Sequence, residues 1–385
     1  MPLSPGCLDG LSALSLRPHS DRSWIESVMN ELLDKFRQEL SEAVLTFIWQ
    51  QWSSIGVMAA GGADRSRVID PEPLLLLTLE LARQDPRMFD EVVDWLIVNG
   101  KWINVVRLST LLKEDKLCSP EVLGAVAATL AEHDRTPKWR GLAKHLKPGV
   151  GKEAESLFEK NGKPLFLSGS EPDNIFHSYG LLRQPLQTRG LSSPVLRSNT
   201  PLWTSTNFMF KARALFGVNI RADVFSFLVL QGASNPTRVA RELGYSQRRV
   251  QDALADMAAA DVFKVRTDGK AREYSVDSES TLRFLGVTEN DISWFDWRAL
   301  SRALVTVWRR AFAIREEGLT PYILESERQR ILGEVKNDLL SAVPKRHATA
   351  RTEALATDRN KGLLGAIRTT LAPSSGHNWK RLSRG

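Results

Sequence analysis

The most constraining feature of this 385-residue chain is a change of hydrophobic period within residues 220–276. Up to Ala260 the apolar residues recur at helical spacing, and Val250, Leu254 and Met257 share one face of a helix. Beyond Ala260 the period falls to two on either side of an Asp-Gly pair, which is typical of a β-hairpin. The stretch therefore predicts helices followed by a two-stranded hairpin.

Glycine, asparagine, proline and serine divide the helical part into three segments. Gly232 and Gly244 are expected to end helices, because glycine readily adopts the left-handed backbone of a helix exit. Asn235 and Pro236 restart the chain, since asparagine is a favoured N-cap and proline suits the first helical position. Ser246 is expected to cap the third helix. The predicted helices span 221–231, 236–243 and 246–257, and the hairpin spans 262–276.

This order of elements, with the spacing VAREL-G-YSQRRVQDALADM and a basic hairpin behind it, resembles the winged helix-turn-helix domain of bacterial MarR- and ArsR-type regulators. The resemblance covers 220–276 only. It implies that 236–243 is the positioning helix, 246–257 the recognition helix and 262–276 the wing. It also implies double-stranded DNA as the partner, with the recognition helix in the major groove and the wing on the backbone or minor groove.

The candidate DNA-binding residues are polar or basic side chains outside the predicted buried faces. Arginine can bond guanine and glutamine can bond adenine through two hydrogen bonds, whereas basic wing residues contact phosphate or the minor groove. The candidates are Ser246, Gln247, Arg248 and Gln251 on the third helix, with Lys264, Arg266, Lys270 and Arg272 on the hairpin. Because residues 220–276 hold nine Lys/Arg against seven Asp/Glu, a wing that binds protein stays an alternative.

Charge and cysteine content limit what the rest of the chain can do. The formal charge is +7, and residues 342–385 alone hold nine Lys/Arg against two Asp/Glu, so the upstream chain is neutral overall. This tail is expected to be mostly disordered apart from a helical patch at 363–371, and to attract polyanions. Cys7 and Cys118 are too few for a disulfide framework or a zinc site and fit a reducing cytoplasm.

Signals for membrane insertion and catalysis are missing from the sequence. No apolar run approaches the ~20 residues that a transmembrane helix needs, so no membrane contact is expected. No phosphate-binding loop, metalloprotease histidine pair, nucleophile elbow or dinucleotide fingerprint occurs. We therefore expect no catalytic residue, no metal site and no cofactor, and the chain is predicted not to be an enzyme.

Hydropathy and composition divide a mainly α chain into six regions. An N-terminal all-helical domain precedes a winged helix-turn-helix domain with a small β-hairpin wing, and flanking C-terminal helices follow. The predicted regions are a disordered tail at 1–22, the all-helical domain at 23–147, a Pro/Gly/Ser-rich linker with extended segments at 148–205, the winged domain at 206–280, a helical region at 281–341 and the basic tail at 342–385.

Large aromatic residues at helical spacing are expected in protein cores rather than in a ligand site. In the first half they are Trp24, Trp49, Trp52, Trp95, Trp102 and Trp139. Arg107, in a helix predicted at 103–112, is expected on the surface. A second apolar stripe consists of Trp294, Trp297, Leu300, Leu304 and Trp308. It is a candidate homodimer seam within 294–340, and packing of this helix on its own molecule is the alternative.

Three functional hypotheses follow. The first is a bacterial DNA-binding transcription regulator whose N-terminal helical domain senses a ligand, binds a protein partner or dimerises. The second is an antitoxin-like or scaffold protein whose winged helix mainly binds a protein. The third is an enzyme whose site the sequence does not reveal. The sequence identifies neither an operator nor an effector.

Overall fold

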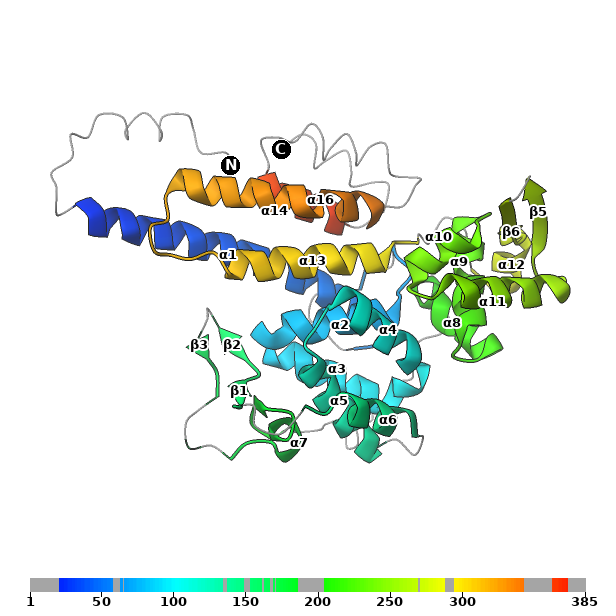
Figure 1. The fold of residues 1–385 in the computed structure, drawn as a ribbon, viewed down its shortest axis with the longest axis horizontal. Helices are drawn as coiled ribbons and strands as arrows, with labels where there is room; N and C mark the ends of the chain where they lie inside the picture. The colour runs from blue at the N-terminus through cyan, green and yellow to red at the C-terminus, as the bar shows by residue number, and fades with distance from the viewer. Residues whose placement is uncertain are drawn as a thin grey trace.

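The computed structural model describes residues 21–57, 63–64, 66–133, 137–148, 153–160, 163–166, 169, 171–185, 204–268, 271–287, 294–342 and 362–372. Within them the fold is mainly helical, as predicted, with three small two-stranded sheets (Figure 1). None of the described helices is both long and apolar enough to span a bilayer.

The first half of the chain forms a helical body. Its elements are α1 (Asp21–Ser54), α2 (Pro71–Leu81), η2 (Ala82–Gln84), α3 (Pro86–Asn99), η3 (Gly100–Trp102), α4 (Val105–Asp115), α5 (Pro120–His133) and α6 (Pro137–His145). Local chemistry starts α3, because Asp85 accepts a hydrogen bond from Met88 N and Pro86 occupies the first helical position. At the centre lies α2, in which every residue except Glu80 is buried.

Described parts of the predicted linker at 148–205 pack against this body. Strand β1 (Glu155–Ser156) pairs in parallel with β4 (Leu181–Leu182), and β2 (Glu159–Lys160) pairs antiparallel with β3 (Lys163–Pro164). Helix α7 (Asn174–His177) lies between β3 and β4 in sequence. The side chains that these segments bury in the body core are Leu157, Phe158, Phe176, Tyr179 and Leu181. The extended segments are thus part of the body's core.

The residues from 204 to 287 form what we call the helix–hairpin unit. It consists of η4 (Ser205–Asn207), α8 (Phe208–Phe216), α9 (Ile220–Gln231), α10 (Pro236–Leu243), α11 (Gln247–Ala259), β5 (Lys264–Asp268), β6 (Ala271–Ser275) and α12 (Ser278–Phe284). Most of its buried apolar side chains make a cluster separate from that of the body, whereas Phe210 of α8 belongs to the body core. Figure 1 shows the unit beside one end of the long C-terminal helices.

The chain then returns to the body through α13 (Trp297–Phe312) and α14 (Pro321–Ala342). Trp297, Leu300, Leu304 and Trp308 of the predicted stripe are buried in the body core, where α13 packs against α14, α2 and α1. Trp294 is buried in the core of the helix–hairpin unit. The stripe is therefore filled by intrachain packing, and its interpretation as a homodimer seam is wrong.

Part of the predicted basic tail also belongs to the body. Gly362–Leu371 forms α16, which contacts α14 and α1 and buries Leu363, Ala366, Ile367 and Leu371. The buried Arg67 donates a hydrogen bond from Nη2 to Leu371 O at 2.6 Å. The expected helical patch is therefore a helix of the body, because its apolar face packs against α14 and α1. Residues 343–361 and 373–385, like 1–20, lie outside the described part of the chain.

The predicted core tryptophans divide into two groups. Trp52, Trp95 and Trp139 are buried, and Trp49 and Trp102 are partly buried against the body core. Trp24, in contrast, has an exposed fraction of 58%. Its expected burial is wrong because the first turns of α1 project beyond the neighbouring helices (Figure 1).

Candidate nucleic-acid interface

The turn between α10 and α11 is fixed by its glycine and by the caps around it. Asn235 Oδ1 accepts a hydrogen bond from Arg238 N at 2.9 Å, and Pro236 occupies the first position of α10. Gly244 ends α10 in the left-handed region with φ of 70°. A Cβ at this position would also collide with Leu111 of α4. Glycine suits this position in two ways, because it accepts the left-handed backbone and leaves room for Leu111 of α4.

Helix α11 buries one face and exposes the opposite one along its length. Val250, Ala253, Leu254 and Met257 are buried in the unit, as the helical period predicted. The candidate residues Gln247, Arg248 and Gln251 are all exposed. Ser246 occupies the N-cap position, yet its side chain makes no capping hydrogen bond and is exposed. Ser246 is therefore the N-cap residue, as expected, but its hydroxyl does not cap the helix.

Charge is distributed unevenly along α11. Arg248 and Arg249 lie in its first turn, where the positive end of the helix dipole also lies. Asp252 and Asp256 follow further along, and Asp256 Oδ2 binds Arg221 of α9 at 2.6 Å. The N-terminal end of α11 is consequently the end that favours an anion.

Arg249 and Arg241 were not among the candidates selected from the sequence. Both are exposed, and the side chain of Arg241 is 72% exposed at the end of α10. Arg249 directly follows Arg248 outside the buried positions of α11, so the helical period already contained the signal for it. The sequence gives no such signal for Arg241, because the position of α10 beside α11 depends on the turn at Gly244.

The hairpin distributes its basic residues over two faces. In the β5–β6 register Lys264 lies opposite Ser275 and Arg266 opposite Glu273, so these residues share one face. Arg272 lies opposite Thr267 and belongs to the other face, on which Tyr274 is buried. Lys264, Arg266 and Arg272 are exposed, and Lys270 lies outside the described residues. The three described candidates on the hairpin therefore do not lie on one face: Lys264 and Arg266 share one face, and Arg272 lies on the other.

A short backbone bridge joins the hairpin to the helices. Ser234, between α9 and α10, exchanges two backbone hydrogen bonds with Tyr274 of β6, at 3.0 and 2.9 Å. The buried Tyr274 side chain anchors the same strand in the unit core. The hairpin is therefore held at its base, while its far end extends away from the core (Figure 1).

Several exposed basic side chains of α11 and the hairpin have no carboxylate partner within the described chain. No ion pair forms there at Arg248, Arg249, Arg266 or Arg272. Lys264 is near Asp277, whose pKa is lowered mainly by hydrogen bonds from Ser280 and to a smaller extent by Lys264. The exposed charge on α11 and the hairpin is thus available to an external polyanion.

A buried network of charges attaches this surface to the body. Arg107 of α4 binds Asp70 and Glu72 and donates from Nε to Leu243 O, the last residue of α10, at 2.7 Å. Arg213 of α8 binds Glu72 through both terminal nitrogens, at 2.7 and 2.8 Å. Both arginines have buried side chains. The expectation that Arg107 lies on the surface is wrong, because three acceptors from distant segments meet it in the interior.

The same network holds the residue that precedes Ser246. The Tyr245 hydroxyl donates to Asp223 Oδ2 at 2.6 Å and accepts from Asn104 Nδ2 at 2.9 Å. Burial, together with the Asp223 carboxylate, raises the pKa of Tyr245 well above its ordinary value, so the phenol keeps its proton. Burial opposes ionisation of Glu72, but Arg213 and Arg107 outweigh it and lower the pKa of Glu72. The start of α11 is thereby fixed relative to the body.

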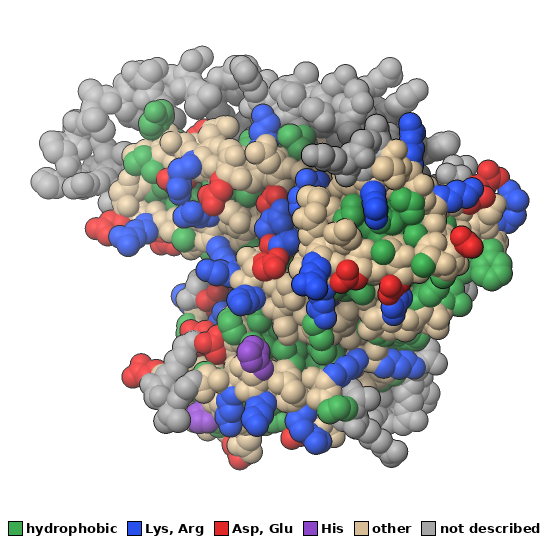
Figure 2. Space-filling view, turned by 45° about the vertical axis from the view of Figure 1, so that its right-hand side comes forward, with side chains coloured by type: hydrophobic (Ala, Val, Ile, Leu, Met, Phe, Trp, Pro, Cys, Tyr) green, Lys and Arg blue, Asp and Glu red, His purple; other side chains and the backbone are tan. Residues whose placement is uncertain are grey.

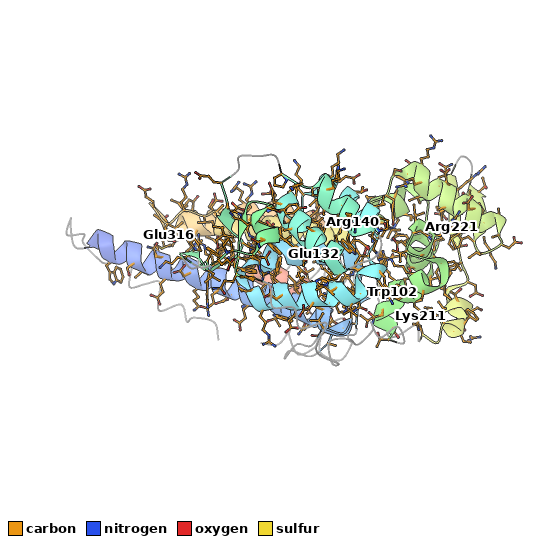
Figure 3. All side chains as sticks on the ribbon, turned by 90° about the horizontal axis from the view of Figure 1, so that it is seen from below. Trp102, Glu132, Arg140, Lys211, Arg221 and Glu316 are labelled. Atoms are coloured by element: carbon orange, nitrogen blue, oxygen red, sulfur yellow. The ribbon has the colours of Figure 1, made fainter. Side chains whose placement is uncertain are left out.

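Packing between body and unit surrounds these charges. Arg213 Nη1 donates to Trp102 O at 2.7 Å, and the Trp102 and Phe210 rings meet edge to face. Within the unit, Lys211 Nζ donates to Leu285 O at 2.9 Å, which joins α8 to the end of α12. Figure 3 labels Trp102 and Lys211 close to this boundary and Arg221 further out on the unit. Body and unit thus meet through backbone, aromatic and charged contacts together.

Comparison with protein-family models, with curated proteins and with solved structures finds no significant match for this chain. Among the described residues, no three His, Cys, Asp or Glu side chains are grouped so that they could hold a metal ion.

Proposed function

We propose that this chain binds double-stranded DNA through α11 and the β5–β6 hairpin. The observation that carries the proposal is the exposed first turn of α11, in which Arg248 and Arg249 lack carboxylate partners among the described residues. In helix-turn-helix proteins the N-terminal residues of the recognition helix contact base edges. Gln247 and Gln251 on the same helix add side chains that can bond adenine.

The order of elements supports the same function. Helix α9, the bridge at Ser234, helices α10 and α11, and strands β5 and β6 follow one another as in the winged helix-turn-helix that the sequence resembles. In this proposal α10 is the positioning helix, α11 the recognition helix and the hairpin the wing. Lys264 and Arg266 on one face of the hairpin then contact phosphate, and the network at Arg107 sets the angle of α11.

Titration of a fluorescein-labelled 30-base-pair duplex with the full chain, followed by fluorescence anisotropy, tests this. We expect binding at 50 mM salt that weakens steeply by 200 mM salt, because every neutralised phosphate releases counterions. The double variant Arg248→Glu/Arg249→Glu should abolish it. Absence of binding by the intact chain at 50 mM salt contradicts the proposal.

A matched control separates this surface from overall charge. Arg315 is exposed in the connection between α13 and α14 and forms no ion pair within the described residues. Its neighbour Glu316 is at the opposite end of the molecule from Arg221 (Figure 3). The double variant Arg315→Glu/Lys336→Glu reverses two exposed cations, as Arg248→Glu/Arg249→Glu does, and should bind the duplex like the wild type. Equal loss in both variants would show that binding follows net charge rather than α11.

A protein partner for the same unit is the second candidate function, and exposed apolar side chains favour it. Phe284 of α12 is 84% exposed and Leu215 of α8 is 56% exposed, on two helices that the Lys211–Leu285 bond brings together. Large exposed apolar side chains on neighbouring elements are typical of interaction surfaces. Phe284→Ser with unchanged duplex binding would show that this apolar surface is separate from the DNA contact.

A further inference from the structure

A cavity of about 850 Å³ opens in the body between the end of α4, the start of α5, the end of α6 and α13. Its apolar walls include Leu112, Cys118, Pro120 and Leu146. Burial raises the pKa of the Cys118 thiol well above its ordinary value, so this wall is uncharged at neutral pH. Both the volume and the apolar lining are those of a small-molecule site.

The rim of this cavity is basic, and much of that charge is uncompensated. Lys113, Lys116, His145 and Arg309 line it. Within the described residues neither Lys113 nor Lys116 forms an ion pair, and both are exposed. Figure 2 shows one face of the molecule, on which lysine, arginine and histidine side chains lie beside hydrophobic ones.

Four other charged or polar side chains of the rim, those of Arg309, Glu114, Ser109 and Thr110, are already engaged. Arg309 binds Glu80 Oε1 at 2.7 Å and donates to Lys116 O at 2.9 Å, while Arg298 binds Glu114 Oε2 at 2.7 Å. The hydroxyls of Ser109 and Thr110 donate to backbone carbonyls one turn earlier in α4. Lys113 and Lys116, with His145 beside them, are therefore the groups left to bind an anion.

Lys116 also adopts an unusual backbone conformation. It ends α4 in the left-handed region, with φ of 50° and ψ of 42°. Its N–H bonds Leu112 O at 3.0 Å and its carbonyl is bound by Arg309, so both sides of the peptide are fixed. This left-handed helix end fixes the point at which the Lys116 side chain leaves the backbone.

We propose that this cavity binds a small organic anion, with its apolar body against Leu112, Cys118 and Leu146 and its acidic group between Lys113 and Lys116. The site is distinct from the DNA-binding surface. It goes beyond the proposed function and does not depend on it.

The test uses the full chain and two dyes of similar shape. 8-Anilinonaphthalene-1-sulfonate carries an anionic group on an apolar body, and N-phenyl-1-naphthylamine is its uncharged counterpart. We expect saturable fluorescence enhancement with one sulfonate dye per chain, and binding of the neutral dye that is about tenfold weaker, because it lacks a charge-assisted contact. Equal affinity for the two dyes, or no saturable binding, would overturn the proposal.

Charge-reversal variants locate the site. Lys113→Glu/Lys116→Glu should weaken binding of the sulfonate dye by about tenfold or more, whereas Lys35→Glu/Lys336→Glu, which reverses two exposed lysines of α1 and α14, should not. Ser109→Trp, which fills the cavity from α4, should abolish binding of both dyes while circular dichroism stays unchanged. If the first pair leaves dye binding intact, the proposal is overturned, and loss of duplex binding instead would assign these lysines to a DNA backbone contact. The dye assays contain no DNA, so their outcome is independent of the proposed function.

Discussion

Two pairs of arginines in this molecule have opposite surroundings. Arg107 and Arg213, at the junction of body and unit, are fully buried and bound to carboxylates. Arg248 and Arg249, at the start of α11, are exposed and have no carboxylate partner in the described chain. The same side chain thus fixes the structure in one region and is left available to a ligand in the other.

The difference follows from the cost of removing charge from water. A buried guanidinium is tolerated only where carboxylates and carbonyls replace its hydration, and such partners make it unavailable to anything else. An exposed guanidinium keeps its hydration and can exchange it for phosphate or a base edge. Whether an arginine stabilises the fold or can bind a ligand therefore depends on its burial and its carboxylate partners, and cannot be told from the residue type alone.

The largest expected effect on stability comes from removing one of the two buried arginines. Arg107→Ala leaves the buried Asp70 without its arginine partner and leaves Glu72 with Arg213 as its remaining arginine, so it should lower the free energy of unfolding by about 3–5 kcal/mol. Urea unfolding followed by circular dichroism measures this. Arg140→Ala, at an exposed position of α6, serves as control and should change stability by less than about 0.5 kcal/mol. A similar value for both variants would remove the distinction between the two regions.

The next largest effect is expected from the buried face of α11, the helix that carries Arg248 and Arg249. Leu254 is fully buried beneath α11, and Leu254→Ala should lower the free energy of unfolding by about 2–5 kcal/mol because it opens a cavity. Thermal unfolding monitors the loss. Ala255→Gly, on the exposed face of the same helix, should cost only about 1 kcal/mol. A fully stable Leu254→Ala protein would contradict the buried face assigned to α11.

An intermediate effect is expected on binding alone. If Arg248 contacts a base, Arg248→Ala should weaken binding to a preferred site by about 1–3 kcal/mol and binding to random duplex only slightly. Its unfolding free energy should stay within about 0.5 kcal/mol of the wild type. Competition anisotropy with the two duplexes provides the measurement. Equal weakening on both would place Arg248 on phosphate.

A pH dependence is expected where α13 begins beside α10. Burial raises the pKa of the Asp296 carboxyl, the cap of α13, to about 7, with Glu242 and Asp338 adding to the rise while the Ala299 N–H bond and Arg302 oppose it. The folded state therefore holds a proton that the unfolded state releases near its ordinary value of 3.8. Stability from this group is lost as pH rises from about 4 to about 7.

Asp296→Asn keeps a capping oxygen without this titration. Urea midpoints measured from pH 5 to pH 8 should fall less steeply in the variant than in the wild type. The exposed cap Asp277, whose pKa is lowered chiefly by hydrogen bonds from Ser280, is already ionised in this range. Asp277→Asn should leave the pH slope unchanged. An unaltered slope in Asp296→Asn would show that the carboxyl is ionised throughout.

The smallest expected effect concerns charge beyond α16. Removing residues 373–385 takes away Lys380, Arg381 and Arg384 while keeping the buried helix α16. Duplex binding should weaken, and the slope of log affinity against log salt should flatten by at most about 0.9 for each lost phosphate contact, with sequence preference unchanged. The same slope before and after truncation would show that these charges act only on solubility.

Local patterns were sufficient for the elements of the unit, because their causes lie within a few residues. The period of Val250, Leu254 and Met257 predicted the buried face of α11, and Gly244 predicted the end of α10. The two faces of the hairpin also follow from its register once the turn is placed. Elements of this kind are determined by neighbours in sequence.

Interactions between distant segments were not predictable in the same way. Arg107 was assigned to the surface because its partners, Asp70 and Glu72, and the Leu243 carbonyl belong to other elements. The apolar stripe of α13 was correctly recognised as apolar, but its period does not distinguish a partner subunit from α14 and α2. Periodicity identifies a buried face and leaves open what covers it.

The shared network between body and unit has a consequence for how the protein can be divided. A fragment of residues 204–287 expressed alone would retain Arg213 and Asp223 but lose Glu72, the carboxylate that holds Arg213 from the body. It would also lose Asn104, which donates to Tyr245. The unit is therefore not an interchangeable module, and chimeras that exchange it between proteins need Glu72, Asn104 and Arg107 transferred with it.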